Sequence, residues 1–146
     1  MNDLIQIKNL HVGFASQDST VDAVKGINFS IPKGKTVALV GESGSGKSVT
    51  ALSILKLLPY PNAHHNTGEI IFENKNLLSF SENEIRKIRG KYITSIFQEP
   101  MTSLNPLHTI EKQINEILML HNKISSQSQI YTNPQQHLRR FSQPQD

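Results

Sequence analysis

The sequence predicts an α/β fold in which a small antiparallel β layer precedes the start of a parallel core sheet. Three observations support this prediction. Two segments near the start alternate apolar and polar residues, as half-exposed strands do. A continuous apolar run, Thr36–Val40, leads through a glycine-rich turn into a segment of helical length. A second such run, Tyr92–Phe97, follows further along the chain, and runs of this kind are typical of strands buried on both faces.

The elements before residue 60 are predicted in order from their hydrophobic periodicity. Leu4–Phe14 and Val24–Ile31 are the two alternating segments, and together they predict the antiparallel layer. Lys47–Leu58 has helical length and is apolar nearly all round, and Pro59 and Pro61 stop it. Buried strand, glycine-rich turn and buried helix form half of a βαβ unit.

The later elements depend on capping and periodicity. Thr67–Phe72 is expected to be a strand, after an exposed loop that contains His64-His65. Ser81 and Glu84 form a capping box, which opens a helix running to about Gly90. A last helix is predicted from the residues that share one face, namely Ile110, Ile114, Ile117, Leu118 and His121.

Composition excludes several classes of protein. The 146 residues fit one domain or a piece of one. The absence of cysteine excludes disulfides, thiol catalysis and thiolate metal sites. No secretory signal is visible and no apolar run is long enough to cross a bilayer. We therefore expect a cytoplasmic protein, whose role at a membrane would depend on a partner.

The formal charge of +3 makes nucleic acid a class of partner to consider. The clearest basic cluster consists of Arg86, Lys87, Arg89 and Lys91, interleaved with apolar residues as on one amphipathic helix. Mixed charge of this kind is typical of a solvated helix face. We therefore predict no nucleic-acid partner.

The glycine-rich segment Gly41–Ser48 fits the G-x-x-x-x-G-K-[ST] pattern called Walker A. Glycines let the backbone turn with its N–H groups pointing inward, and the following helix adds the positive end of its dipole. Lys47 supplies a mobile charge for the β- and γ-phosphates, and Ser48 offers a hydroxyl to Mg²⁺. A plain Gly/Ser turn is the alternative, but a chance match has a probability on the order of half a per cent. The predicted phosphate-binding residues are Gly41, Glu42, Ser43, Gly44, Ser45, Gly46, Lys47 and Ser48.

Two further residues are candidates for the same site. Gln98 ends the run Tyr92–Phe97, and ligands bind beyond the carboxyl ends of parallel strands. Its amide oxygen is a candidate to ligate Mg²⁺ or to orient an attacking water, or else only stabilises its loop. Phe14 is either an aromatic face for adenine or a core residue, and its spacing favours the core.

These residues resemble the ATP-binding subunits of ABC transporters. The resemblance rests on Gly41–Ser48 and on Gln98–Pro106. Within this family they look most like the dipeptide, oligopeptide and nickel importers. Val49–Leu55 and Leu107–Gln113 are similar to the first half of the duplicated ATPase of peptide and microcin C importers. The resemblance covers roughly Leu4 to His121, most of the chain.

The resemblance implies the N-terminal portion of an ABC-type nucleotide-binding domain over residues 1–124, followed by a polar tail, disordered or frameshifted, over residues 125–146. It implies a component that couples ATP binding and hydrolysis to peptide uptake, with ATP and Mg²⁺ as cofactors. Lys47 and Gln98 would act in catalysis, and Ser48 and Gln98 would approach Mg²⁺. Phe14 falls where the family places its adenine-stacking aromatic.

The resemblance also implies partners and a location. The partners are integral-membrane permease subunits, a second ATP-binding domain that completes an ATP sandwich and, indirectly, a solute-binding protein. The location is cytoplasmic and peripheral, on the inner face of a bacterial cell membrane.

The sequence departs from the family in one respect. The Leu-Ser-Gly-Gly-Gln signature, the Walker B strand and the switch histidine have no match, and Ser142–Asp146 stands where the signature is expected. We therefore expect a truncated fragment with negligible hydrolysis alone. A non-catalytic or regulatory nucleotide-binding piece, or a non-functional product, is the alternative. A different P-loop enzyme, such as a small-molecule kinase, ranks last because the loop after Gln98 does not suit one.

Overall fold

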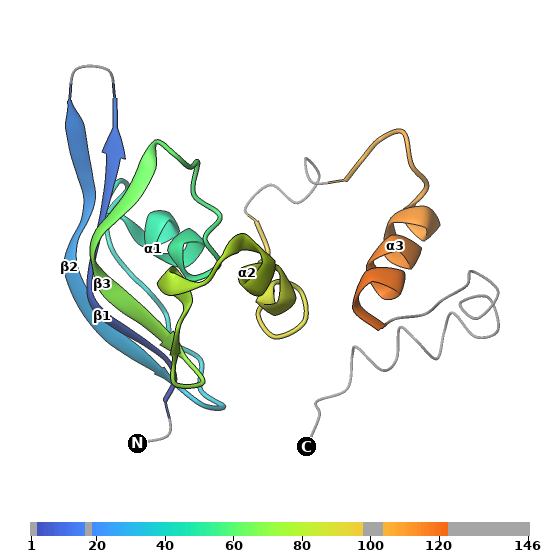
Figure 1. Ribbon diagram of the computed structural model, residues 1–146, viewed down its shortest axis with the longest axis horizontal. Coiled ribbons are helices and arrows are strands. Elements are labelled where there is room, and N and C mark those ends of the chain that lie inside the picture. Colours follow the sequence, from blue (N-terminus) through green and yellow to red (C-terminus); the bar gives the residue numbers. More distant parts are fainter. Residues whose placement is uncertain (1–2, 17–18, 98–103, 123–146) are drawn as a thin grey trace. The chain divides into compact units, whose positions relative to one another are not determined.

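The computed structural model describes residues 3–16, 19–97 and 104–122 of the chain. The chain divides into two compact units, one ending at Ile93 and the other starting at Thr94. The first unit contains a sheet and the helices that position the glycine-rich loop (Figure 1). In the second unit, the described helix is α3, Ile110–Asn122. This helix was predicted from its periodic apolar residues and is confirmed.

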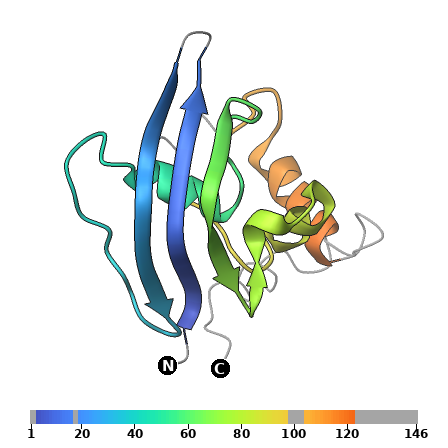
Figure 2. The same ribbon diagram turned by 60° about the vertical axis from the view of Figure 1, so that its left-hand side comes forward.

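The sheet of the first unit has the strand order β2-β1-β3-β4, and all neighbouring strands are antiparallel. Its strands are β1 (Asp3–Ala15), β2 (Thr20–Pro32), β3 (Ala63–Phe72) and β4 (Lys75–Asn76). Figure 2 shows β2, β1 and β3 side by side. The predicted antiparallel layer is therefore confirmed, and the strand predicted over residues 67–72 belongs to it.

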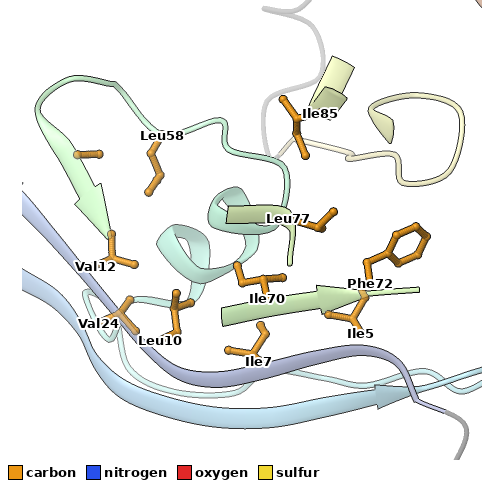
Figure 3. Close-up of a cluster of buried hydrophobic side chains, with 11 residues drawn as sticks. Ile5, Ile7, Leu10, Val12, Val24, Leu58, Ile70, Phe72, Leu77 and Ile85 are labelled. Atoms are coloured by element: carbon orange, nitrogen blue, oxygen red, sulfur yellow. The ribbon is translucent and has the colours of Figure 1, made fainter. Parts of the chain in front are cut away.

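The core lies on one face of this sheet (Figure 3). Apolar side chains from alternate positions of the strands meet those of the following turns and helices, because successive strand residues point to opposite faces. The buried cluster consists of Ile5, Ile7, Leu10, Val12, Val24, Leu58, Ala63, Ile70, Phe72, Leu77 and Ile85. Burial of these side chains supplies the main favourable free energy of this unit.

Helix α1, Lys47–Ile54, follows the glycine-rich loop and ends four residues before the predicted Leu58. The reason is a Schellman motif. Lys56 adopts the left-handed conformation with φ 50°. Its N–H donates to Ser53 O at 3.1 Å, and the Leu57 N–H donates to Leu52 O at 2.9 Å. The backbone hydrogen bonds therefore close the helix before either proline is reached.

The capping box predicted at Ser81 and Glu84 opens helix α2, Glu82–Ile88. The Ser81 N–H donates to Glu84 Oε2 at 2.8 Å, and the Ser81 hydroxyl donates to the same oxygen at 2.6 Å. These hydrogen bonds lower the pKa of Glu84. A short 3₁₀ helix, η1 (Leu77–Ser79), precedes it and covers the core with Leu77.

Two predicted strands are not strands in the structure. Thr36–Val40 and Tyr92–Phe97 lie outside every described strand, apart from one isolated bridge at Ile93. Both are largely exposed, Val40 to 90% and Ile96 to 94% of the residue's possible area. An apolar composition indicates that a segment suits a buried environment. A strand also needs a neighbouring strand with which its backbone forms hydrogen bonds. Within the described residues, no strand pairs with either run, and the bridge joins Ile93 only to Arg89.

Two smaller predictions were also wrong. His64 and His65 lie in β3 rather than in an exposed loop, and both are half-buried. The expected solvated basic face does not include Arg89, whose guanidinium turns inward onto backbone carbonyls of Leu55 and Lys56. None of the described helices is long and apolar enough to span a bilayer.

We expect His65 to make the fold less stable at mildly acidic pH. Burial, then the charges of Lys56 and His64, lower the pKa of His65. The unfolded chain therefore binds a proton more readily than the folded chain. The stabilising effect is complete above about pH 6.5, the ordinary value for histidine, and is lost as the pH falls through the folded-state pKa.

Urea unfolding across this pH range checks the expectation. His65→Gln should remove part of the pH dependence of the free energy of unfolding. His64→Gln should leave most of that part in place, because the charge of His64 is the smallest of the three causes. Identical pH dependence in wild type and His65→Gln would contradict it.

Candidate functional site

The candidate site is the loop Gly41–Ser48, which leads directly into α1 (Figure 1). Gly46 is the N-cap of the helix and has a left-handed backbone, with φ 85° and ψ 4°. A left-handed N-cap turns the chain sharply from the loop into the helix. The loop therefore runs up to the helix N-terminus, where the backbone N–H groups of the first turn point outward.

Gly46 also fixes where α1 begins against the sheet. An added Cβ would lie 2.6 Å from the carbonyl oxygen of Ala23 and 3.1 Å from Cγ2 of Val24, both in β2. Only a residue without a side chain permits so close an approach. The N-terminal end of α1 is therefore held against β2, at the edge of the sheet.

The N-terminus of α1 has no side-chain cap. Gly46 makes no side-chain hydrogen bond, and the first turn contains no acidic residue. The Thr50 N–H is the first to bond within the helix, to Gly46 O at 2.8 Å. The N–H groups before it and the positive end of the helix dipole are thus left to an external anion.

Lys47 brings a positive charge to the same place. Its ammonium donates to Gly41 O at 2.8 Å, to Glu42 O at 2.5 Å and to Ser45 Oγ at 3.2 Å. These contacts use all three donors of the group. The loop thus holds the charge between its backbone and the start of the helix. An ammonium on a flexible stem, uncapped N–H groups and a tight glycine turn together fit a phosphate group.

The other predicted site residues that the structure describes make no side-chain contact that indicates a role in phosphate binding. Ser48 is exposed in the first turn of α1, where its hydroxyl is open to a ligand, and Glu42 and Ser43 are exposed in the loop. Phe14 is half-buried in β1 and packs against the core cluster. Gln98 lies outside the described residues. The structure thus brings together the eight loop residues, which the sequence motif had identified.

The role of one residue that contacts α1 was missed from the sequence. Arg89 contacts the C-terminal end of α1, the opposite end from the loop. Its partners are backbone carbonyls 33 and 34 residues earlier in the chain. Carbonyls carry no sequence signal, so the contact could not be found by motif or spacing.

A glycine-rich turn, a lysine and a helix N-terminus define the class of P-loop proteins. The sequence pattern that describes the ABC transporter family matches residues 24–145, and the chain belongs to this family. Among characterised proteins, it is 57% identical over 122 residues to a peptidoglycan transport ATP-binding protein, YejF, of Agrobacterium fabrum. It is 50% identical over 125 residues to the oligopeptide transport ATP-binding protein OppD of Bacillus subtilis.

The chain spans only part of these relatives. The matches cover 84% and 86% of this chain but 22% and 35% of the relatives' lengths. Among solved structures, it is similar to the ATP-binding cassette MJ0796, a bacterial ABC transporter cassette solved as a dimer. The TM-score is 0.68 at 28% identity, covering 80% of this chain and 47% of that one. The same cassette bound to ADP and phosphate gives 0.64 at 26% identity. The predicted fold class, the N-terminal part of an ABC nucleotide-binding domain, is thereby confirmed.

Proposed function

We propose that this chain is part of the ATP-binding component of an ABC importer for peptides. The observation that carries the proposal is the position of the Lys47 ammonium inside the glycine-rich loop, at the uncapped N-terminus of α1. The names of two relatives, an oligopeptide and a dipeptide transport ATP-binding protein, support peptides as the solute.

In this proposal the loop binds the β- and γ-phosphates of ATP. Lys47 exchanges its bonds to Gly41 O and Glu42 O for phosphate oxygens, which is favourable because the phosphate carries the opposite charge. Backbone N–H groups of the loop and of the first helical turn bind the remaining oxygens. Glu42 and Ser43, both exposed, are proposed to contribute through their backbone N–H groups.

Mg²⁺ fits the same site, since the exposed Ser48 hydroxyl lies in the first helical turn beside Lys47. Bound Mg²⁺ would neutralise part of the charge on the phosphates. We propose Ser48 as its protein ligand, with Gln98 as a second. Phe14 is proposed to face the adenine with the part of its ring that the core leaves open.

Hydrolysis and transport would need more than this loop. No residue of the chain matches the family's catalytic glutamate, so we propose that the chain alone hydrolyses ATP negligibly. A second ATP-binding domain and membrane permease subunits are the proposed partners, with a solute-binding protein acting through the permease. The dimeric cassette structure supports the second domain. The proposed location is the cytoplasmic face of the cell membrane.

A calorimetric titration of the whole chain with Mg-ATP tests the proposal. We expect saturable binding that Lys47→Ala weakens on the order of tenfold to a hundredfold, because charge-assisted hydrogen bonds to phosphate are lost. Lys25→Ala is the matched control, since it removes an exposed lysine of β2 outside the loop. Circular dichroism should show all three proteins folded. Folded wild type that binds no ATP, or Lys47→Ala that binds as wild type does, would sink the proposal.

A further inference from the structure

The C-terminal end of α1 presents carbonyl groups that the helix itself does not satisfy. The last four carbonyls of any helix lack intrahelical partners. In the Schellman motif, Leu52 O and Ser53 O accept hydrogen bonds from the N–H groups that follow the helix. Leu55, the C-cap, and Lys56, the residue after it, carry further carbonyls beside the C-terminal end of the helix, where the negative end of the helix dipole lies.

Arg89, the residue that ends α2, occupies this end of α1. Its Nε donates to Leu55 O and its Nη2 donates to Lys56 O, both at 2.8 Å. Its Nη1 contacts Glu82 Oε1 of the first turn of α2 at 2.5 Å. One planar guanidinium therefore joins the end of α1 to both ends of α2.

The two kinds of contact differ in weight. The Arg89 side chain is 23% exposed, whereas that of Glu82 is 65% exposed. An ion pair with so exposed a carboxylate contributes little. The two carbonyl bonds are charge-assisted and partly shielded from water, and they place a cation at the negative end of the helix dipole. The contact with α1 is therefore the one that matters.

Helix α1 depends on such external contacts. It has eight residues, and helices this short are marginal without tertiary support. Gly46 holds its N-terminal end against β2. Arg89 holds its other end, so that the axis of the helix is fixed at both ends.

We propose that Arg89 is a positioning residue for phosphate binding. It fixes the orientation and the last turn of α1, and thereby the N–H groups and Lys47 at the first turn. The proposal rests on the proposed binding of ATP by the loop. It assigns a role in the site to a residue that lies at the far end of the helix and does not itself touch the nucleotide.

Arginine suits this role and lysine does not. The guanidinium donates from separate N–H groups in a fixed plane, so it reaches two successive carbonyls and a carboxylate together. The neighbouring Lys56 shows the contrast. Its ammonium turns away from α1 to Phe80 O at 2.7 Å and Leu78 O at 3.3 Å, and thus supports η1 instead.

The test compares Arg89→Lys and Arg89→Gln with wild type in Mg-ATP titrations, under conditions where circular dichroism shows every protein folded. We expect the Kd for ATP to rise about threefold to tenfold, within the range typical of substitutions that affect a site without touching its ligand. Amide hydrogen exchange should become faster at Gly46–Val49, the start of α1, although the substitution is at the other end.

Two controls separate positioning from stability. Ile85→Val removes one buried methyl group from α2 and lowers stability without touching the carbonyls of α1. Glu82→Gln weakens only the ion pair with Arg89. Both should leave the Kd within about twofold of wild type, the size expected of substitutions outside the coupled contacts.

The outcomes distinguish this inference from the proposed function. Arg89 variants with wild-type Kd and wild-type exchange at Gly46–Val49 would overturn the positioning role. So would an Ile85→Val protein that loses affinity to the same extent. If wild type binds no ATP, the proposed function fails, and the exchange rates at Gly46–Val49 alone decide whether Arg89 fixes the start of α1.

Discussion

Gly46→Ala is expected to abolish detectable ATP binding and to destabilise the first unit. The new Cβ would lie 2.6 Å from the carbonyl oxygen of Ala23. That carbonyl belongs to β2, whose next residue, Val24, pairs with Val12 of β1, so it cannot retreat without disturbing the sheet. The start of α1 must move instead, and the phosphate-binding groups move with it.

The expected loss of stability has two parts. The left-handed backbone at Gly46, with φ 85°, costs an alanine about 1–2 kcal/mol. Overpacking against β2 adds about 1–3 kcal/mol. Urea unfolding followed by circular dichroism measures the sum, and an Mg-ATP titration at a temperature where the variant stays folded measures the loss of binding.

Gly44→Ala is the matched control for this prediction. Gly44 also has a left-handed backbone, with φ 80°, but an added Cβ would meet nothing within 4 Å. It should therefore lose only the conformational part, about 1–2 kcal/mol. If Gly46→Ala bound ATP as well as Gly44→Ala does, the close approach of α1 to β2 would not matter for the site.

The sequence was sufficient where the determining interactions are local. The alternation of Leu4–Phe14 and Val24–Ile31 predicted β1 and β2, and the capping box at Ser81 predicted α2. The glycine-rich loop was likewise identified from the residues Gly41–Ser48 alone. In each case the interacting residues are neighbours in the sequence, or their periodic spacing indicates which face of the element is buried.

The sequence failed where a distant partner decides the structure. Thr36–Val40 has the composition of a buried strand, yet strand formation depends on which segment lies beside it. No described segment does so, and Val40 is largely exposed. The prediction that Arg89 lies on a solvated face was wrong for a related reason. Its partners are backbone carbonyls distant in the sequence, and composition does not reveal such partners.

Leu10→Ala is expected to cause the largest loss of stability, about 3–5 kcal/mol. Leu10 is fully buried in the core that β1, β2 and β3 share with the elements above them (Figure 3). It pairs with Ile27 of β2, at a point where the register of β1 shifts. The strands on both sides restrict collapse around the missing atoms. The cavity therefore stays open, and the loss of stability includes the whole cavity term.

Lys8→Ala is the control on the same strand. Lys8 is exposed and pairs with Glu69 of β3, so its loss should change the free energy of unfolding by no more than about 0.5 kcal/mol. Equilibrium urea unfolding, followed at the far-ultraviolet signal of the sheet, measures both variants. Natural domains are stable by only about 5–15 kcal/mol, so Leu10→Ala should remove a large share of the total. A loss below about 1 kcal/mol would mean that the face of the sheet bearing Leu10 does not form the core. Truncation of a fully buried leucine at a rigid position lowers the free energy of unfolding by more than that.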